Sequence, residues 1–364
     1  MRIVNLSDAK ARLSEILNEV EAGEEVIIIR KELTQRFIKD SERIAATFIG
    51  DFNLAFGAEV AQLASPLHRW IDFVIRYVEP ANRKLEVSGD FWKRVPGDMA
   101  TTVDRITRLV CRGGDINPYQ SRGLTGNDVS GEQRAQRTDL LWADWGIRHF
   151  HLTGQAIAPG QYYSERSDWL LFALVFKDTV FCIDVRRHPT GAGFADDELL
   201  AIAIHNWPAV FERYRLKGVL GIKREPGYTQ NDTHALRKSG VTTVVEVDGA
   251  VYAPPGGGIT TAATSTRVSL LANQIGRAVI GLASQFADEQ GAAAGRCRDA
   301  GILHPQFQLS VTPRGLAVYE HNLDMAWLVT GGGDAPAWAE TLAPQWAIAR
   351  LPCGSFQRLK VAAP

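Results

Sequence analysis

Apolar residues between positions 32 and 112 recur at the three- and four-residue spacing of amphipathic helices. Ser65 and Pro66 suit an N-cap and a first helical position, and the apolar residues that follow share one helical face: Leu67, Trp70, Ile71, Val74 and Val78. The stretch "DMATTVDRITRLVCRGG" has the same period. A third apolar face follows Lys31 and comprises Leu33, Phe37, Ile44 and Phe48. We therefore predict a helical region over residues 32–112.

Between residues 138 and 330 the pattern changes to the two-residue period of strands. The stretches "WGIRHFHL", "DWLLFALVF" and "TVFCIDVRRH" alternate in this way. Turn-forming residues predict three hairpins, at 177–178, 248–249 and 313–315. Helices are predicted over "DDELLAIAIHNW" and from about Ser265 to Gln285. The segment is typical of an α+β domain with an antiparallel sheet.

Two further segments lack either period. Residues 113–137 are rich in Gly, Asn, Asp and Ser, and we interpret them as a loop or linker. Residues 331–364 are rich in Gly, Ala and Pro, and we interpret them as an irregular C-terminal tail. The predicted order is thus a short N-terminal segment, a helical region, a linker, the α+β domain of residues 138–330 and the tail.

The first 31 residues predict a compact β-α-β unit. "RIVN" forms a short strand, and Ser7 can cap the helix that follows, with an apolar stripe at Leu13, Ile16, Leu17 and Val20. Gly23 can end this helix, and "EEVIIIR" predicts a β-branched strand from Val26 to Ile29. A unit of this size cannot bury its own apolar stripe, so we expect it to need a partner surface.

The stretch "MRIVNLSDAKARLSEILNEVEAGEEVIIIRK" resembles the N-terminal part of Phd/YefM-type antitoxins of type II toxin–antitoxin systems. The matching positions include Asn5, Ser7, Ala9, Lys10, Leu13, Ser14, Leu17, Val20, residues 22–24, Val26, Ile28 and Arg30. The resemblance implies a homodimer through residues 1–31 that regulates transcription by binding operator DNA, with a cognate toxin as a further partner. It implies DNA-binding roles for Asn5, Ser7, Lys10, Arg12 and Arg30.

The sequence departs from that family after Lys31. The family continues through a Gly-containing turn into a second strand, whereas "ELTQRFIKDSERIAATFIGDF" has no Gly, Asn or Pro at its start and has a helical period. The family's toxin-binding tail is also missing. A fusion of an antitoxin remnant to a larger protein would explain the change, and so would a β-α-β piece that now serves only in packing.

Composition excludes several classes of protein. The chain has 364 residues and a net charge of -1, so it has no chain-wide basic surface for nucleic acid or membrane. Four cysteines without a CxxC pair argue against a zinc site or a disulfide framework. The start lacks a signal peptide, and no segment approaches the ~20 apolar residues of a membrane span. We expect a cytoplasmic protein without a membrane partner.

The stretch between Arg148 and His188 has the densest set of reactive side chains. Period 2 places His149 and His151 on one face of a strand. With Arg166 and His188 they could cleave RNA without a metal: one imidazole would take the 2′-hydroxyl proton, another would protonate the leaving oxygen, and arginine would stabilise the phosphorane. This layout of His and Arg on a small sheet is distantly similar to RelE-type ribonuclease toxins.

Other interpretations of these residues stay open. Histidines on a sheet face are often hydrogen-bonded packing residues, and His149 and His151 could instead bind a metal with Asp144 or Asp184. The glycines 256–258 precede a helix and could hold an anion, although a flexible connection explains them as well. No cofactor motif is present. We favour an antitoxin-like protein with a large domain of unknown activity; the alternatives are an RNase-like toxin domain over residues 138–330 and a non-catalytic mobile-element protein.

Overall fold

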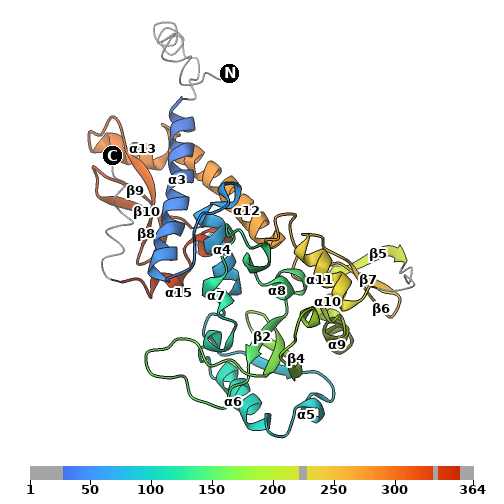
Figure 1. Ribbon diagram of the computed structural model, residues 1–364. Coiled ribbons are helices and arrows are strands. Elements are labelled where there is room, and N and C mark those ends of the chain that lie inside the picture. Colours follow the sequence, from blue (N-terminus) through green and yellow to red (C-terminus); the bar gives the residue numbers. More distant parts are fainter. Residues whose placement is uncertain (1–27, 221–227, 331–334, 353–364) are drawn as a thin grey trace. The chain divides into compact units, whose positions relative to one another are not determined.

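The chain divides into two compact units, whose elements carry the labels of Figure 1. The structure is a computed structural model that describes residues 28–220, 228–330 and 335–352. One unit runs from Asn53 to Leu270, and the other combines the chain up to Phe52 with the chain from Leu271 onward. The fold is mixed α+β, and every sheet of the described residues contains antiparallel strand pairs, as the sequence predicts.

The unit from Asn53 to Leu270 is built on a four-stranded sheet with the order β1-β4-β3-β2. Its strands are β1 (Lys84–Val87), β2 (Arg148–His151), β3 (Trp169–Val175) and β4 (Thr179–Arg187). Strands β3 and β4 form the predicted hairpin around residues 177–178, β2 pairs antiparallel with β3, and β1 pairs parallel with β4. The prediction of a wholly helical region over residues 32–112 is wrong at β1, because four residues are too few to show a period.

Helices cover both faces of this sheet. On one face, α5 (Phe91–Arg94) and α6 (Ala100–Cys111) belong to the same apolar cluster as the strand residues Phe150, Leu171 and Cys182. On the other face, α8 (Leu140–Trp145), α9 (Glu198–Asn206) and α10 (Pro208–Phe211) cluster with Leu170 and Phe172. Figure 1 shows α6 and α9 on opposite sides of β4. Alternate strand residues therefore enter two separate cores.

A smaller sheet in the same unit has the order β5-β7-β6, with β5 (Arg215–Leu220), β6 (Val245–Val247) and β7 (Ala250–Tyr252). Helix α11 (Gln230–Lys238) precedes β6 and begins with a capping box of Thr229 and Asp232. Asp248 and Gly249 both have positive φ, 52° and 75°, as a two-residue type I′ turn requires. The predicted hairpin at residues 248–249 is confirmed.

Helix α4 (Pro66–Arg76) begins as predicted, since the His68 N–H donates to Ser65 Oγ at 3.3 Å and Pro66 takes the first position. The same unit also contains short helical turns: η1 (Ala61–Leu63), η2 (Asn117–Tyr119), α7 (Gly123–Gly126), η3 (Arg134–Gln136), η4 (Gly193–Ala195) and η5 (Glu212–Tyr214). Three of these, η2, α7 and η3, lie within residues 113–137.

The other unit packs α3 (Ile28–Asp51) against a three-stranded antiparallel sheet. The order is β10-β9-β8, with β8 (Phe307–Thr312), β9 (Gly315–Glu320) and β10 (Met325–Leu328). The predicted apolar face of α3 is buried, and β8 and β9 form the predicted third hairpin. The remaining helices are α12 (Thr266–Phe286), within which the division between units falls, α13 (Ala292–Asp299), α14 (Ala337–Leu342) and α15 (Gln345–Ile348).

Two predictions at the chain ends need correction. The predicted strand from Val26 to Ile29 is wrong at Ile28 and Ile29, which form the start of α3. β-Branched residues disfavour a helix by only a few tenths of a kcal/mol each, so continuity with a long packed helix outweighs their strand preference. The predicted irregular tail contains α14 and α15, where Ala339, Leu342 and Ile348 are buried.

Candidate active site

Two histidines share one face of the four-stranded sheet on β2. His149 lies opposite Phe172 and His151 lies opposite Leu170, two residues of the core that α9 covers. The centroids of the two imidazole rings are 6.3 Å apart, and the rings meet edge to face. The strand period therefore places both side chains together, as the sequence predicts.

His188 joins this pair from the segment after β4. Its backbone N–H donates to the Asp168 carbonyl at 2.6 Å, and its ring stacks on His151 with centroids 5.7 Å apart and planes 22° apart. Phe194, from η4, contacts both His149 and His188, with ring centroids at 5.1 and 5.6 Å. We refer to His149, His151, His188 and Phe194 as the histidine cluster.

The cluster runs from the core to the surface. His188 is exposed, whereas His151 retains 6% of its accessible surface. Burial lowers the pKa of His151 to about 4, and the neighbouring His149 and His188 act in the same direction. Burial also lowers the pKa of His149, and the carboxylate of Asp139 opposes part of that effect. The side chains of His149 and His151 are therefore neutral at pH 7.

Asp139 lies beside the buried end of the cluster. One of its carboxylate oxygens accepts the Trp142 N–H at 3.1 Å and caps α8. The other oxygen is 3.6 Å from Nδ1 of His149, too long for a hydrogen bond, and that nitrogen is buried without a hydrogen-bond partner. His149 is thus a packed neutral side chain next to a carboxylate.

Hydrogen bonds assign opposite tautomers to His151 and His188. Nδ1 of His151 accepts the Ser167 backbone N–H at 3.3 Å, so its Nε2 carries the proton of the neutral ring. Nδ1 of His188 is 3.0 Å from the Pro189 carbonyl, which can only accept, so Nε2 of neutral His188 holds a lone pair. The stacked pair therefore offers one N–H donor and one proton acceptor.

Arginines near the cluster differ in their freedom to bind a ligand. Arg186 donates to Asp184, Asp196 and Glu198, so its guanidinium is already paired. Arg187 lies over the Trp169 ring at 5.0 Å and is exposed. Arg166 is exposed and close enough to lower the pKa of His151. Within the described ranges neither Arg166 nor Arg187 forms an ion pair, so both guanidinium groups are available to bind an anion.

The structure pairs both carboxylates that the metal interpretation would use. Asp144 accepts from Arg237 Nε at 2.8 Å, and Asp184 accepts from Arg94 and Arg186 at 2.9 and 2.8 Å. Across the described part of the chain, no group of three or more His, Cys, Asp or Glu side chains is arranged to hold a metal ion. The histidines are therefore interpreted without a metal.

Glycines 256–258 connect β7 towards α12, and their N–H groups are already bonded. Gly256 donates to the Asp144 carbonyl and Gly258 to the Ala143 carbonyl, at 2.9 and 3.0 Å. A Cβ on Gly256 would come within 2.4 Å of the Trp142 carbonyl oxygen. The anion-binding interpretation is wrong here, because these glycines allow close packing against α8.

The DNA-binding residues that the antitoxin resemblance implies lie almost entirely outside the described residues. Asn5, Ser7, Lys10 and Arg12 precede Ile28, where the description begins. Arg30 belongs to α3, so its backbone is helical. The antitoxin-like role of residues 1–31 stays a prediction of the sequence.

Comparison with protein-family models, with curated proteins and with solved structures found no match. In the described segments, no helix combines the length and the apolar character that crossing a membrane requires. Sequence reasoning did not identify Phe194 or Asp139 as parts of the site. Asp139 has a local signal, its position as an N-cap before "LLWADW", whereas Phe194 has none because tertiary packing alone brings it to the histidines.

Proposed function

We propose that the unit from Asn53 to Leu270 is a metal-independent endoribonuclease, with His188 as general base and His151 as a neutral hydrogen-bond donor. The observation that carries the proposal is the stacked pair of imidazoles with opposite tautomers, of which His188 is exposed. A base and a donor side by side are what attack by a ribose 2′-hydroxyl on the adjacent phosphate requires.

The proposed reaction is an internal transesterification. Nε2 of His188 takes the proton of the 2′-hydroxyl, whose oxygen forms a bond to phosphorus while the bond to the 5′-oxygen breaks. Because the 5′-oxygen leaves opposite the attacking 2′-oxygen, solvent water protonates it, and the imidazolium of His188 then gives up its proton to solvent. The products are a 2′,3′-cyclic phosphate and a 5′-hydroxyl.

The remaining side chains stabilise the negative charge of the phosphate and hold the reacting groups in position. Nε2–H of His151 donates to a non-bridging phosphate oxygen, and its low pKa keeps the ring a neutral donor throughout the reaction. Arg166 and Arg187 are the exposed cations that attract the phosphodiester backbone. His149 acts as a positioning residue, since its ring contacts His151 on one side and Phe194 on another, and Phe194 in turn contacts His188.

The test is cleavage of a labelled RNA oligonucleotide by the full-length protein in the presence of EDTA. We expect fragments with 2′,3′-cyclic phosphate ends and no cleavage of the matching DNA, which lacks the attacking hydroxyl. His188→Ala should reduce the rate by about 10²- to 10⁴-fold. His151→Phe, which keeps a ring but removes the donor, should also reduce it by a factor of about 10² or more.

The matched control is His205→Ala. His205 is exposed on α9 and pairs with Asp248 at 2.6 Å, outside the histidine cluster. Its loss should leave RNA cleavage unchanged. Intact RNA with the wild-type protein, or equal rates for wild type and His188→Ala, would contradict the proposed function.

A further inference from the structure

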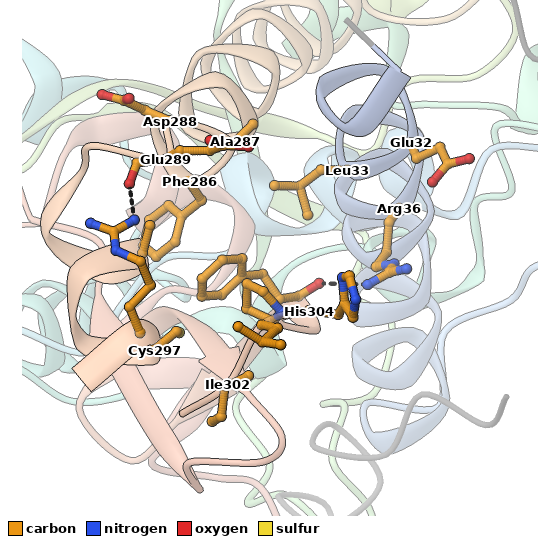
Figure 2. A pocket seen from close by; sticks show the side chains of 15 residues that line it. Glu32, Leu33, Arg36, Phe286, Ala287, Asp288, Glu289, Cys297, Ile302 and His304 are labelled. Atoms are coloured by element: carbon orange, nitrogen blue, oxygen red, sulfur yellow. Dashed lines mark hydrogen bonds between the residues drawn. The ribbon is translucent and has the colours of Figure 1, made fainter. Parts of the chain in front are cut away.

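The unit that contains α3 and the β8–β10 sheet has a cavity of its own. The cavity has a volume of about 450 Å³ and lies between the first turns of α3, the end of α12, α13 and the segment before β8 (Figure 2). Cavities of roughly 300–1,000 Å³ are typical of small-molecule sites. The proposed ribonuclease uses none of these residues.

Aromatic and aliphatic side chains form one wall of the cavity. Phe286 and Phe307 meet edge to face with ring centroids 5.2 Å apart, and Trp327 packs against both at 5.9 Å. Leu33 of α3 and Ile302 add aliphatic side chains to the lining, as Figure 2 shows. Trp327 does not itself line the cavity, but its contacts help to hold the two phenylalanine rings in place, and these rings offer an apolar surface that suits a flat ligand.

Arg36 is held beside that wall. Its Nη1 donates to the Phe307 backbone carbonyl at 3.3 Å, which holds the guanidinium next to an aromatic residue of the cavity. The charge of Arg36 also reaches the carboxyl group of Asp40 on the same helix, where it acts to lower the pKa. The bond to Phe307 uses one of the five guanidinium N–H groups, so others can serve a ligand. His304 also lines the cavity and adds a second nitrogen donor.

Acidic side chains limit the charge of the ligand. Glu32, Asp288 and Glu289 line the cavity, and all three are exposed. A ligand with several acidic groups would bring negative charge near these carboxylates, whereas one acidic group can pair with Arg36. Arg298 is a second cation of the lining, but its Nη1 already donates to the Glu289 backbone carbonyl. With three carboxylates against two guanidiniums, the lining favours a ligand with no more than one negative charge on an otherwise apolar body.

We propose that this cavity binds a small organic monoanion. Its aromatic or aliphatic body would lie against Phe286, Phe307 and Leu33, and its carboxylate, sulfonate or similar group would accept hydrogen bonds from Arg36 and His304. An Arg–oxyanion contact is charge-assisted and can be bidentate, which makes it the group that selects an acid over a neutral molecule of equal size.

Two fluorescent probes of similar shape test the proposal on the full-length protein. 8-Anilinonaphthalene-1-sulfonate carries a negative charge, and N-phenyl-1-naphthylamine is its neutral counterpart. We expect saturable binding of both probes at one site. Arg36→Ala should weaken binding of the sulfonate by about tenfold or more and should leave binding of the neutral probe nearly unchanged.

Control variants locate the site and separate it from general electrostatics. Lys39→Ala removes a positive charge from an exposed position of the same helix, outside the cavity, and should not change sulfonate binding. Ala294→Trp fills the cavity and should abolish binding of both probes. If Arg36→Ala does not fold, Arg36→Gln keeps a donor for the Phe307 carbonyl and removes the charge. If Ala294→Trp does not fold, Ala294→Phe replaces it.

Three results would overturn the proposal. The first is the absence of saturable binding of the sulfonate. The second is unchanged sulfonate binding by folded Ala294→Trp or Ala294→Phe, which would place the probe elsewhere. The third is a loss of affinity in Arg36→Ala that is equally large for the sulfonate and for the neutral probe. A loss of sulfonate affinity in Lys39→Ala as large as that in Arg36→Ala would count in the same way. Either result would show that Arg36 does not recognise the anion.

Discussion

Arg237 of α11 and Asp144 of α8 form an ion pair that is almost completely buried, with Nε and Oδ2 2.8 Å apart. The guanidinium also donates to the Phe194 carbonyl at 2.8 Å and lies over the Trp145 ring, 4.0 Å from its centroid. One arginine thus connects two helices to a residue of the histidine cluster. The pair contributes to the position of the site as well as to stability.

Removing one member of this pair leaves the other charge buried without a partner. We expect Arg237→Met to lower the free energy of unfolding by about 3–5 kcal/mol. The measurement is urea unfolding followed by tryptophan fluorescence. The matched control is Arg108→Met, which breaks the exposed pair with Asp104 and should cost less than about 1 kcal/mol. Equal effects of the two substitutions would contradict a special role for burial.

Acid should destabilise the protein through His151. The folded-state pKa of His151 is lowered from 6.5 to about 4 by burial, so the unfolded chain binds more protons between these values. Stability is therefore fully present above pH 6.5, falls as the pH drops towards 4 and levels off below it, a loss of about 3 kcal/mol from this residue. His149, whose pKa is also lowered by burial, acts in the same direction.

Urea unfolding at several pH values measures this dependence. His151→Gln should flatten the curve between pH 6.5 and 4, because the variant has no proton to bind there. Gly276→Ala, which changes no titratable group, should keep the wild-type slope. A slope that is unchanged by His151→Gln would show that other groups cause the acid sensitivity.

Gly256 should tolerate no side chain. A Cβ at this position would approach the Trp142 and Ala143 carbonyl oxygens and the Gly146 nitrogen to 2.4–2.7 Å, and all three are backbone atoms. We expect Gly256→Ala to lower the melting temperature by several degrees, as a loss of about 2 kcal/mol or more would produce. Gly276→Ala on α12, where a Cβ meets nothing within 4 Å, should instead raise stability by about 0.5–1 kcal/mol.

DNA binding by the N-terminal segment follows from the antitoxin resemblance and needs its own test. We expect the full-length protein to bind DNA from upstream of its own gene, with an affinity that falls steeply with salt. Lys10→Ala and Arg12→Ala should each weaken binding and reduce the salt slope by about one, measured by fluorescence anisotropy. Lys84→Ala, on β1, should have no effect. Absent or salt-independent binding would remove the antitoxin interpretation.

The parts of the fold that the sequence predicts well depend on local contacts. The Asp248-Gly249 hairpin follows from two residues that accept positive φ, and the start of α4 follows from the cap by Ser65. β1 could not be predicted, because its four residues become a strand only by pairing with β4 far along the chain. The two-unit division has the same cause, since contacts between distant segments define it.

The candidate site was predictable only where one strand determines it. The two-residue period places His149 beside His151, and no knowledge of the fold is needed for that. The position of His188 depends on the register of β3 and β4, in which Leu170 lies opposite both His151 and Arg186. The opposite tautomers depend on the carbonyl of Pro189 and the N–H of Ser167, which only the folded chain brings to the rings.

The pairing of α3 with β8 has a consequence for biosynthesis. Asp40 accepts the Leu309 N–H at 2.8 Å, and Arg43 donates to the Leu309 carbonyl at 2.8 Å, across 269 and 266 residues of chain. A ribosome synthesises α3 before its strand partner, which emerges only after the whole segment from Asn53 to Leu270. We expect the segment from Asn53 to Leu270 to fold during synthesis. Until β8 has been made, the apolar face of α3 remains uncovered and can bind chaperones.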